Sequence, residues 1–393
     1  MSEEKNVPKL RFPGFTEPWE QRKLEEVFQH IGNAFVGTAT PYYVEDGHFY
    51  LESNNIKDGQ INHNAEVFIN DEFYEKQKDK WLHTGDMVMV QSGHVGHAAV
   101  ISEKLNNSAA HALIMFRNPS AEIEPYFLNY QYQTLKSRKK IEMITTGNTI
   151  QHILASDMQE FEIDLPNLKE QAKIAAYFQS LDRLITLHQR KLGHVKDLKK
   201  SMLQKMFPKN GELYPEVRFP GFTAAWEQRK LEDEAIEMLV GGDIDKSRVV
   251  ENGKYPIYAN ALTNDGIVGY YNDYYRVKAP AVTVTGRGDI GHAQARTADF
   301  TPVVRLLAIR SEHDVYFLEN AINKHGVIVE STGVPQLTVP QLGNYMIQFP
   351  RTIEEETKIG DYFHTLDRLI TLHQRELDHL QLLKKGMLQQ MFV

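Results

Sequence analysis

The chain has 393 residues, a formal net charge of −8 and no cysteine. Its length allows two to three domains, and its 41% hydrophobic and 24% charged residues are ordinary for a soluble globular protein. The lack of cysteine excludes disulfides and thiolate metal sites. No apolar run approaches the length of a membrane span, and the charged N-terminus does not have the apolar core of a signal peptide. We therefore expect a cytoplasmic protein without membrane contact.

Charge is distributed unevenly along the chain. Residues 25–164 contain 10 Lys/Arg and 20 Asp/Glu, whereas residues 167–207 contain 9 and 3. An acidic total does not exclude nucleic-acid binding, because only the contacting face must be positive. Charge alone therefore does not identify the partner.

The edges of the first half of the chain recur in the second half. Three segments are repeated unchanged: RFPGFT at 11–16 and 218–223, WEQRKL at 19–24 and 226–231, and LDRLITLHQR at 181–190 and 366–375. The inner segments, 25–164 and 232–348, share little. One chain thus carries two versions of one module. We call the repeated segments of each module its frame and the inner segment its contents. Identical frames suggest two equivalent contacts with one partner, and different contents suggest two different targets.

The first inner segment predicts mixed α and β structure. A strand at 86–90 leads into a glycine turn at 93–98, and a helix over 126–141 follows. A Thr-Thr-Gly turn at 145–147 precedes a final strand that ends near Pro166. The basic run 136–140 on this helix is compatible with phosphate contacts, and equally with a solvated helix C-terminus.

A long helix of about 35–40 residues is predicted next, and a second one ends the chain. Their apolar positions follow the 4, 3, 4, 3 spacing of a coiled coil. The first seam consists of Ile174, Phe178, Leu181, Ile185, His188, Leu192, Val195, Lys199, Met202 and Met206. The second consists of Ile359, Phe363, Leu366, Ile370, His373, Leu377, Leu380, Lys384, Met387 and Met391.

Two such helices in one chain most simply pair with each other; the alternative is two unrelated helices packed on separate cores. The same two polar residues, a His and a Lys, interrupt both seams. We interpret His188 and His373 as residues that fix the register of the pair, in preference to metal or catalytic residues.

A linker at 208–215, rich in Pro, Gly and Asn, leads to the second inner segment. Its predicted order matches the first: a strand at 281–285, a glycine turn at 288–293, a helix over 315–324, a Ser-Thr-Gly turn at 331–333 and a strand ending near Pro350. This shared order predicts one fold for both modules.

Several short motifs match part of a catalytic or ligand-binding pattern but lack the rest of that pattern. Residues 286–291 match the glycine pattern of dinucleotide-binding sites, but no helix is predicted after them, so we interpret them as a tight turn between strands. His94 and His97 have no third ligand at a recognisable spacing, so a metal site is not predicted. No phosphate-binding loop, nucleophile elbow or paired-acid nuclease site is present.

The frame segments identify a resemblance to a known family. The WEQRKL openings and the helical pattern Gln171-x-x-Ile174…Phe178-x-x-Leu181-Asp182-x-x-Ile185 resemble the specificity subunit of type I restriction-modification enzymes, over essentially the whole chain. The second copy departs from the first at Glu356, which stands where the first has Gln171.

The resemblance implies an α+β fold with an internal pseudo-twofold repeat. Two mixed α/β target-recognition domains are separated by two long helices that form an antiparallel coiled coil. The expected boundaries are 1–166 for the first domain, 167–208 for the first spacer helix, 209–348 for the linker and second domain, and 349–393 for the second spacer helix.

The resemblance also implies a division of labour. Each domain reads one half of a bipartite site in double-stranded DNA, the helices set the spacing between the halves, and their flanks dock two copies of a methylation subunit. S-adenosylmethionine belongs to that subunit, and ATP hydrolysis and cleavage belong to a restriction subunit. The chain itself is expected to be non-catalytic, without a cofactor or metal.

The resemblance also implies that the residues that touch bases lie in the variable inner segments. Polar side chains in turns beside strands have the chemistry to read base edges, although a solvated loop residue has the same pattern. The candidates are Asn54, Lys57, Gln91, Ser92, His94, Asn148, Thr149 and Gln151 in the first domain, and Asn260, Thr263, Arg276, Thr285, Arg287 and Gln336 in the second. A self-contained methyltransferase or nuclease and a protein-interaction scaffold remain as alternative functions.

Overall fold

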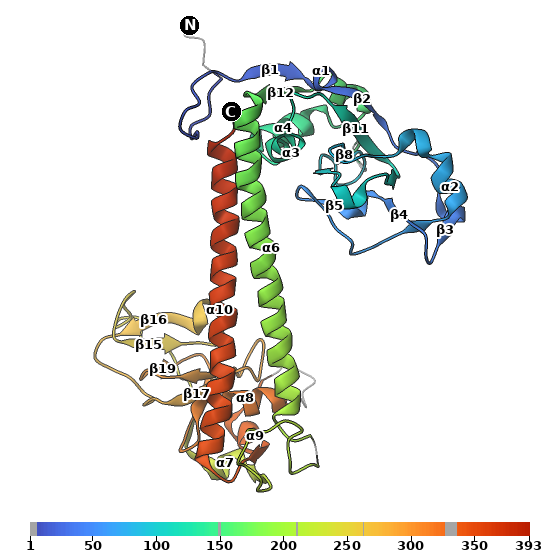
Figure 1. The fold of residues 1–393 in the computed structure, drawn as a ribbon. Helices are drawn as coiled ribbons and strands as arrows, with labels where there is room; N and C mark the ends of the chain where they lie inside the picture. Colours follow the sequence, from blue (N-terminus) through green and yellow to red (C-terminus); the bar gives the residue numbers. More distant parts are fainter. Residues whose placement is uncertain (1–5, 148–150, 210, 262, 327–335) are drawn as a thin grey trace. The chain divides into compact units, whose positions relative to one another are not determined.

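The computed structural model describes residues 6–147, 151–209, 211–261, 263–326 and 336–393 (Figure 1). The chain divides into two compact units. Unit 1 consists of residues 1–187 together with 377–393, and unit 2 consists of residues 188–376. Each unit therefore combines one inner segment with parts of both long helices.

Unit 1 contains short strands and short helices ahead of its long helix. The strands are β1 (Glu20–Lys23), β2 (Phe28–Asn33), β3 (Tyr43–Val44), β4 (His48–Leu51), β5 (Ile56–Lys57), β6 (Gln60–Ile61), β7 (Phe68–Ile69), β8 (Met87–Val90), β9 (Ala98–Val100), β10 (Ala109–Ala110), β11 (Leu113–Pro119) and β12 (Glu162–Leu165). The helices are α1 (Leu24–Val27), α2 (Asp71–Lys76), α3 (Pro125–Tyr132), α4 (Leu135–Ile144), α5 (Ala155–Gln159) and α6 (Leu168–Lys205), whose first part belongs to this unit.

Unit 2 repeats this plan with fewer strands. They are β13 (Glu227–Lys230), β14 (Ala235–Val240), β15 (Tyr255–Tyr258), β16 (Ile267–Tyr271), β17 (Ala281–Val284), β18 (Ala293–Arg296), β19 (Thr301–Pro302), β20 (Leu307–Ser311) and β21 (Met346–Phe349). The helices are α7 (Leu231–Glu234), α8 (Val315–His325), α9 (Val339–Gly343) and α10 (Ile353–Gln390), which ends in unit 1.

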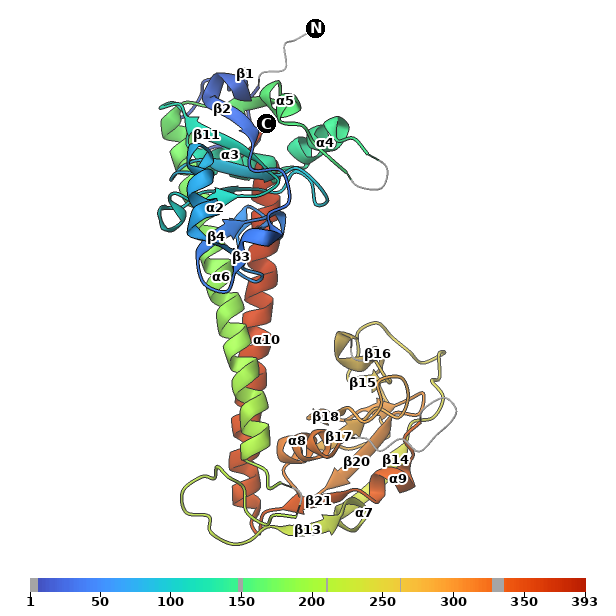
Figure 2. The ribbon, with the colours of Figure 1, turned by 90° about the vertical axis from the view of Figure 1, so that its right-hand side faces the viewer.

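The main sheets of the two units have the same strand order. In unit 1 an antiparallel sheet runs β2-β11-β8-β9, and in unit 2 the order is β14-β20-β17-β18. Strand β8 is buried along its whole length because both faces are covered, and its sequence is accordingly apolar throughout. Helix α8 packs on β17 and β18 in unit 2 (Figure 2). The prediction of one fold for both modules is confirmed.

The repeated WEQRKL segment forms the same structure twice. Its EQRK residues form β1 and β13, which pair antiparallel with β12 and β21, the last strands of the inner segments. Glu20 lies opposite Leu165, and Glu227 lies opposite Phe349. These ladders close each inner segment into a loop whose two ends meet beside a long helix.

The repeated RFPGF segment anchors that closure to the first turn of a long helix. In unit 1 the guanidinium Nε of Arg11 donates to Glu170 at 2.6 Å, and Nη2 donates to the other carboxylate oxygen at 2.7 Å. In unit 2 Arg218 and Glu355 form the same two-bond contact at 2.6 and 2.8 Å. Both carboxylates are buried. A two-bond guanidinium–carboxylate contact compensates for this burial, which explains why the motif recurs unchanged.

Helices α6 and α10 each have 38 residues, as predicted. Within unit 2, His188 on α6 lies beside Glu376 on α10, and Lys199 on α6 forms an ion pair with Asp367 on α10. The residue numbers rise along α6 while those of their partners fall along α10, so the two helices run antiparallel (Figure 1). The alternative of two unrelated helices is therefore wrong. Among the described residues no helix has the length and apolar character needed to span a membrane.

Every seam residue of the two helices is buried or half-buried, and the two histidines are half-buried. Ile174, Phe178 and Leu181 lie in the unit 1 core, and their repeat equivalents Ile359, Phe363 and Leu366 lie in the unit 2 core. Leu192 and Leu377 are also buried, whereas Ile185 and Ile370 are half-buried.

The two lysines in the seams form ion pairs with the facing helix. In unit 2 Lys199 Nζ lies 2.6 Å from Asp367, and in unit 1 Lys384 Nζ lies 2.6 Å from Asp182. The pairs occupy equivalent positions in the repeat. Each lysine is thus compensated where it leaves the apolar seam.

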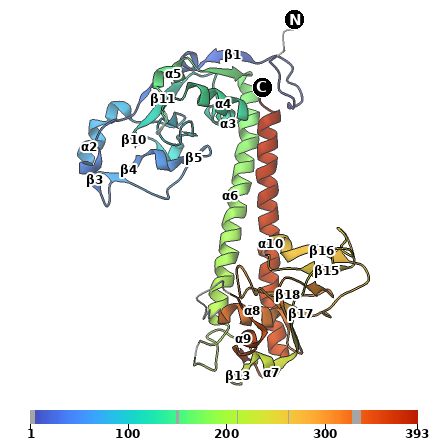
Figure 3. The same cartoon turned by 180° about the vertical axis from the view of Figure 1, so that it is seen from behind.

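The end of each long helix enters the core of a unit. Phe207 follows α6 and packs on Trp226 and Phe317 in unit 2. Phe392 follows α10 and packs on Trp19 and Phe127 in unit 1, where α3 lies beside α6 (Figure 3). Phe392, close to the C-terminus, is therefore part of the same unit 1 core as Trp19 of the N-terminal segment.

One predicted helix is wrong in its extent. Residues 126–141 were expected to form a single helix, but the structure has α3 and α4 separated at Gln133 and Thr134. Thr134 caps α4, because its hydroxyl accepts a hydrogen bond from Ser137 N–H at 3.2 Å. The predicted helix 315–324 is confirmed as α8.

Candidate nucleic-acid interface

Two equivalent turns present five of the candidate base-reading residues, namely Gln91, Ser92, His94, Thr285 and Arg287. The β8–β9 turn spans 91–97, and the β17–β18 turn spans 285–292. In the first, Val90 N–H donates to His97 O at 2.8 Å; in the second, Thr285 N–H donates to His292 O at 3.0 Å. The predicted tight turn at 286–291 is confirmed, because strand β18 follows it. Both turns project from the same position of the shared sheet.

In unit 1, backbone hydrogen bonds bring a second loop to this turn. Gly93 N–H donates to Gln151 O at 3.1 Å, and Ile153 N–H donates to Gln91 O at 3.0 Å. Ser92 is joined to His152 by a β-bridge. Candidates Gln91, Ser92 and Gln151 therefore lie together, with exposed His94 on the same turn. Asn148 and Thr149 lie outside the described residues.

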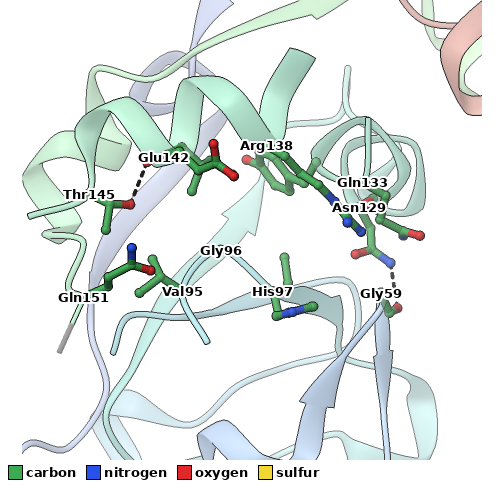
Figure 4. Close-up of a pocket in the computed structure, with 13 residues that line it drawn as sticks. Gly59, Val95, Gly96, His97, Asn129, Gln133, Arg138, Glu142, Thr145 and Gln151 are labelled. Carbon is green, nitrogen blue, oxygen red and sulfur yellow. Dashed lines mark hydrogen bonds between the residues drawn. The ribbon is translucent and has the colours of Figure 1, made fainter. Parts of the chain in front are cut away.

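A cavity of about 220 Å³ opens beside the β8–β9 turn (Figure 4). Arg138 and Glu142 extend along one wall from α4, and Val95, Gly96 and His97 form the opposite wall. Most residues of this lining are not among the predicted candidates; it also includes Gly59, Ala98, Asn129, Tyr132, Gln133, Ile141, Thr145 and the candidate Gln151. The lining is mainly polar, as expected for a surface that contacts a nucleic acid.

His97 presents a hydrogen-bond donor at this cavity. Burial lowers the pKa of His97, although the Asp58 carboxylate opposes the shift. Its Nδ1 accepts a hydrogen bond from Asp58 N–H at 3.3 Å. Because a neutral imidazole that accepts at one nitrogen carries its proton on the other, Nε2 is a donor. A donor here suits the acceptor atoms that purines and thymine present in the major groove.

Lys57 lies on the neighbouring β5–β6 hairpin, and Asn54 lies in the short 3-10 turn Ser53–Asn55 just before it; both are exposed. The backbone of Asn54 accepts a hydrogen bond from the Asn62 side chain at 3.2 Å, which fixes the loop. Lys57 pairs with Gln60 across the hairpin, and Gly59 at its tip lines the cavity. The hairpin thus brings one candidate cation close to the cavity.

The basic run on α4 is divided between two roles. Lys136 lies 3.0 Å from Asp164, and Lys140 donates to Glu162 O at 3.3 Å, so both contact frame strand β12. Arg138 instead faces the cavity. Composition alone does not separate these neighbours, because helical phase decides which of them faces the cavity.

In unit 2 the equivalent turn is fixed at Gly286. Asn260 Oδ1 accepts from Gly286 N–H at 2.7 Å, and Leu337 N–H donates to Gly286 O at 3.0 Å. A Cβ at Gly286 would lie 2.5 Å from Arg305 O, so only glycine fits. Candidates Asn260 and Thr285 therefore lie at this turn, and Gln336 is the residue before Leu337, which is bonded to it.

The candidates around the second turn differ in their accessibility. Thr285 is buried, and its hydroxyl accepts from His292 N–H at 2.9 Å, which makes it a structural residue of the turn. Arg287 is exposed at the tip. Arg276 is exposed and donates to Val240 O at 3.1 Å. No hydrogen bond or ion pair among the described residues joins exposed Thr263 to the turn.

Strained backbone lies next to the second turn. Val304 and Arg305 have φ values of +52° and +68°, which is uncommon for residues other than glycine. Val304 N–H and Arg305 N–H donate to Gly242 O and Gly241 O at 2.8 and 3.1 Å, which holds this conformation. Arg305 is exposed, and it is not among the predicted candidates because Val-Arg carries no turn signature.

These turns combine cations, amides and hydroxyls, which have the chemistry to contact base edges and phosphates. Among residues with described positions, one group of histidine and acidic side chains is close enough to share a metal ion, and it lies on the long helices.

Comparisons with known proteins agree with this arrangement. The family model described as the type I restriction modification DNA specificity domain matches residues 16–197 and 224–382. A putative type I specificity subunit of Mycoplasma pneumoniae, S.MpnORF507P, is 28% identical over 218 residues, which are 53% of this chain and 55% of that protein. The putative specificity subunit of the Methanocaldococcus jannaschii restriction enzyme MjaX is 21% identical, over 97% of this chain and 94% of its own.

The fold also matches a solved structure. The crystal structure of a type I restriction-modification S subunit from M. genitalium aligns with a TM-score of 0.71 and 16% sequence identity, over 98% of this chain and 99% of that one.

Proposed function

The chain belongs to the type I restriction-modification DNA specificity family, and from this we propose that each of its two units reads one half of a bipartite site in double-stranded DNA. The observation that carries the proposal is the contrast between frame and contents. The same Arg–Glu contact, strand ladder and sheet order recur in both units, while the turns that they present differ in sequence.

We assign base reading to the two equivalent turns and their neighbours. In unit 1 these are the β8–β9 turn and the cavity beside it, with Gln91, His94, His97, Arg138 and Gln151 as the reading groups. Glu142 in the same lining is an acceptor, suited to the amino group of cytosine or adenine.

In unit 2 the reading groups that we assign are Asn260, Arg276, Arg287, Arg305 and Gln336. The arginines have the geometry to contact guanine O6 and N7 with two hydrogen bonds. Because Thr285 is buried in its turn, we assign it a structural part in place of a base contact.

The long helices are proposed to set the distance between the half-sites. A 38-residue helix is about 57 Å long at 1.5 Å per residue. Half-site spacing on a duplex must match a fixed distance between readers, and a paired helix is stiffer than a linker. The identical frame surfaces suit two copies of one methylation subunit.

We further propose that the chain carries no catalysis. Methylation with S-adenosylmethionine and ATP-dependent cleavage would belong to the methylation and restriction subunits. The polar groups at the two turns form hydrogen-bonding surfaces rather than a nucleophile–base pair.

Coexpression with a methylation subunit tests the whole proposal. Mapping of methylated adenines should show one bipartite motif with a fixed spacer. The purified chain alone should neither bind S-adenosylmethionine nor methylate DNA. Saturable binding of that cofactor by the isolated chain would overturn the division of labour, and a continuous motif would overturn the two-reader proposal.

A further inference from the structure

Two histidines and a glutamate meet on the long helices within unit 2. His188 lies on α6, and His373 and Glu376 lie on α10; all three are half-buried. Glu376 Oε2 lies 3.0 Å from His188 Nδ1 and 3.4 Å from His373 Nδ1. One ligand atom from each residue lies within 4.8 Å of the other two. We propose that these side chains bind a single divalent metal ion of the zinc class, for which Zn²⁺ is the representative ion.

The distances suit a shared ion. Ligands held at about 2.0–2.1 Å in a tetrahedral zinc site lie about 3.3 Å from one another. The two Nδ1–Oε2 distances, 3.0 and 3.4 Å, are close to this value. The imidazole planes meet at 61° with ring centroids 5.6 Å apart, so the rings are not stacked face to face. Small side-chain rotations therefore complete the site.

Within the described part of the chain, the Nδ1 atom of His188 lacks the hydrogen bond that a buried nitrogen normally makes. Nδ1 is buried and has no hydrogen-bond partner among the described residues, although the Glu376 carboxylate is 3.0 Å away. The approach is close, but the alignment is not that of a hydrogen bond. A buried nitrogen without a partner is unfavourable, and an ion between the two atoms would satisfy both of them.

The ligand types select the ion. Two imidazoles and one carboxylate suit Zn²⁺, Co²⁺, Ni²⁺ or Cu²⁺, whereas Mg²⁺ and Ca²⁺ prefer oxygen ligands throughout. The Glu376 side chain is 43% exposed, compared with 17% for His188 and 16% for His373. Water therefore has access to the fourth coordination position, and three protein ligands with one water complete the tetrahedron.

The internal repeat supplies an independent observation. LDRLITLHQR is identical in both copies and ends just before Lys191 in the first and Glu376 in the second. Duplication explains the two histidines, and so does a role in helix register. Neither explains a carboxylate at this position in one copy only. The departure replaces an ammonium, which cannot bind a metal, with the third ligand.

The proposed ion would join α6 to α10 within unit 2. Because the ligands come from both helices, binding would stabilise their antiparallel register. The register role predicted for His188 and His373 would then depend partly on metal. This inference does not rest on DNA reading, so it can fail while the proposed function stands.

Cobalt titration of the full-length chain tests the site. After treatment with a chelator, the wild type should bind one Co²⁺ with visible absorption typical of four-coordinate cobalt, and Zn²⁺ should displace it. H188N and E376Q should each weaken binding at least tenfold. K191E places a carboxylate three residues from His188 on the same helix face and should tighten binding.

Matched controls separate the site from adventitious histidines. His194 and His379 are exposed on the same helices at equivalent repeat positions. The H194N/H379N variant should bind as the wild type does. Zn²⁺ should raise the melting temperature of the wild type and of this control, but not that of E376Q. The proposal is overturned if the wild type does not bind, or if H188N and E376Q bind as tightly as the control variant.

Discussion

Units 1 and 2 share a frame, but they differ where the frame meets its contents. In unit 1, Gln171 donates to Glu122 O at 3.1 Å and accepts from Glu124 N–H at 3.0 Å. In unit 2 the equivalent Glu356 instead contacts His313 at 2.9 Å and accepts from Asp314 N–H at 3.2 Å.

The replacement of Gln171 by Glu356 in the frame is accompanied by a different partner in the inner segment, His313. His313 also contacts Glu234 at 2.8 Å. Burial opposes protonation, but hydrogen bonds to both carboxylates raise the pKa of His313. The Glu at this frame position is therefore compensated by a histidine that the inner segment supplies.

Breaking the buried Arg–Glu contact tests whether the two frames are energetically equivalent. R11A and R218A leave the Glu170 and Glu355 carboxylates buried without a cation. Each variant should lose about 3–5 kcal/mol of stability, confined to its own unit. Urea unfolding followed by hydrogen exchange resolves the units. R22A, a surface control, should lose less than about 1 kcal/mol. A loss in one unit only would show that the frames differ.

The aromatic residues at the helix ends test the same equivalence through packing. F392A should destabilise unit 1 by about 3–5 kcal/mol, and F207A should destabilise unit 2 by a similar amount, because each removes a buried ring. Hydrogen exchange in β1 and β12 should rise in F392A although they lie far away in the sequence. Unchanged protection there would contradict the assignment of Phe392 to the unit 1 core.

The residue beside the Lys–Asp pair predicts a pH response in unit 2 that has no counterpart at the equivalent pair of unit 1. In unit 1, Tyr130 donates to Asp182 at 2.8 Å, whereas in unit 2 burial, and then repulsion from Asp367, raise the pKa of Glu319 to about 7. Because the unfolded pKa is about 4.3, the folded state binds more protons between these values, and unit 2 loses stability as pH rises from about 4 to 7.

E319Q should therefore stabilise unit 2 by about 2 kcal/mol at pH 8 and flatten its pH dependence. Denaturation midpoints measured from pH 5 to 8 check this. A destabilised E319Q at pH 8 would contradict the raised pKa of Glu319, and an equal effect of E319Q on the pH dependence of unit 1 would contradict the comparison.

The two Lys–Asp pairs should differ by a smaller amount. Asp182 and Lys384 are each 14% exposed, whereas Lys199 and Asp367 are 24% and 37% exposed. Double-mutant cycles should give about 1–2 kcal/mol of coupling for the first pair and less than about 1 kcal/mol for the second. The reverse order would show that solvent exposure does not govern these pairs.

The sequence predicts the parts of this molecule that depend on periodicity and repetition. The seam spacing predicts two helices of the observed length, and the repeat predicts equivalent structure in the two WEQRKL segments, which form β1 and β13. The break between α3 and α4 was missed, because the Thr134 cap interrupts a segment whose composition remains helical.

The candidate interface was harder to predict. Gln91 and Gln151 were chosen as turn residues, and the structure joins their loops. The cavity wall formed by Asn129, Gln133 and Arg138 was missed, since helical phase and tertiary packing decide which side chains face it. Thr285 was chosen for its hydroxyl, which the turn itself uses.

Duplication of one inner segment tests most directly the claim that the frames are equivalent and the contents are the readers. The register of β1 with β12 and of β13 with β21 makes 25–164 and 232–348 equivalent segments. The variant carries 25–164 in both positions, with E356Q so that the second frame offers the glutamine that this segment contacts. It is coexpressed with the methylation subunit, and methylated adenines are mapped. We predict a palindromic bipartite motif built from one of the original half-sites. A motif that keeps both original half-sites, or one whose two halves are unrelated to each other, would contradict the account.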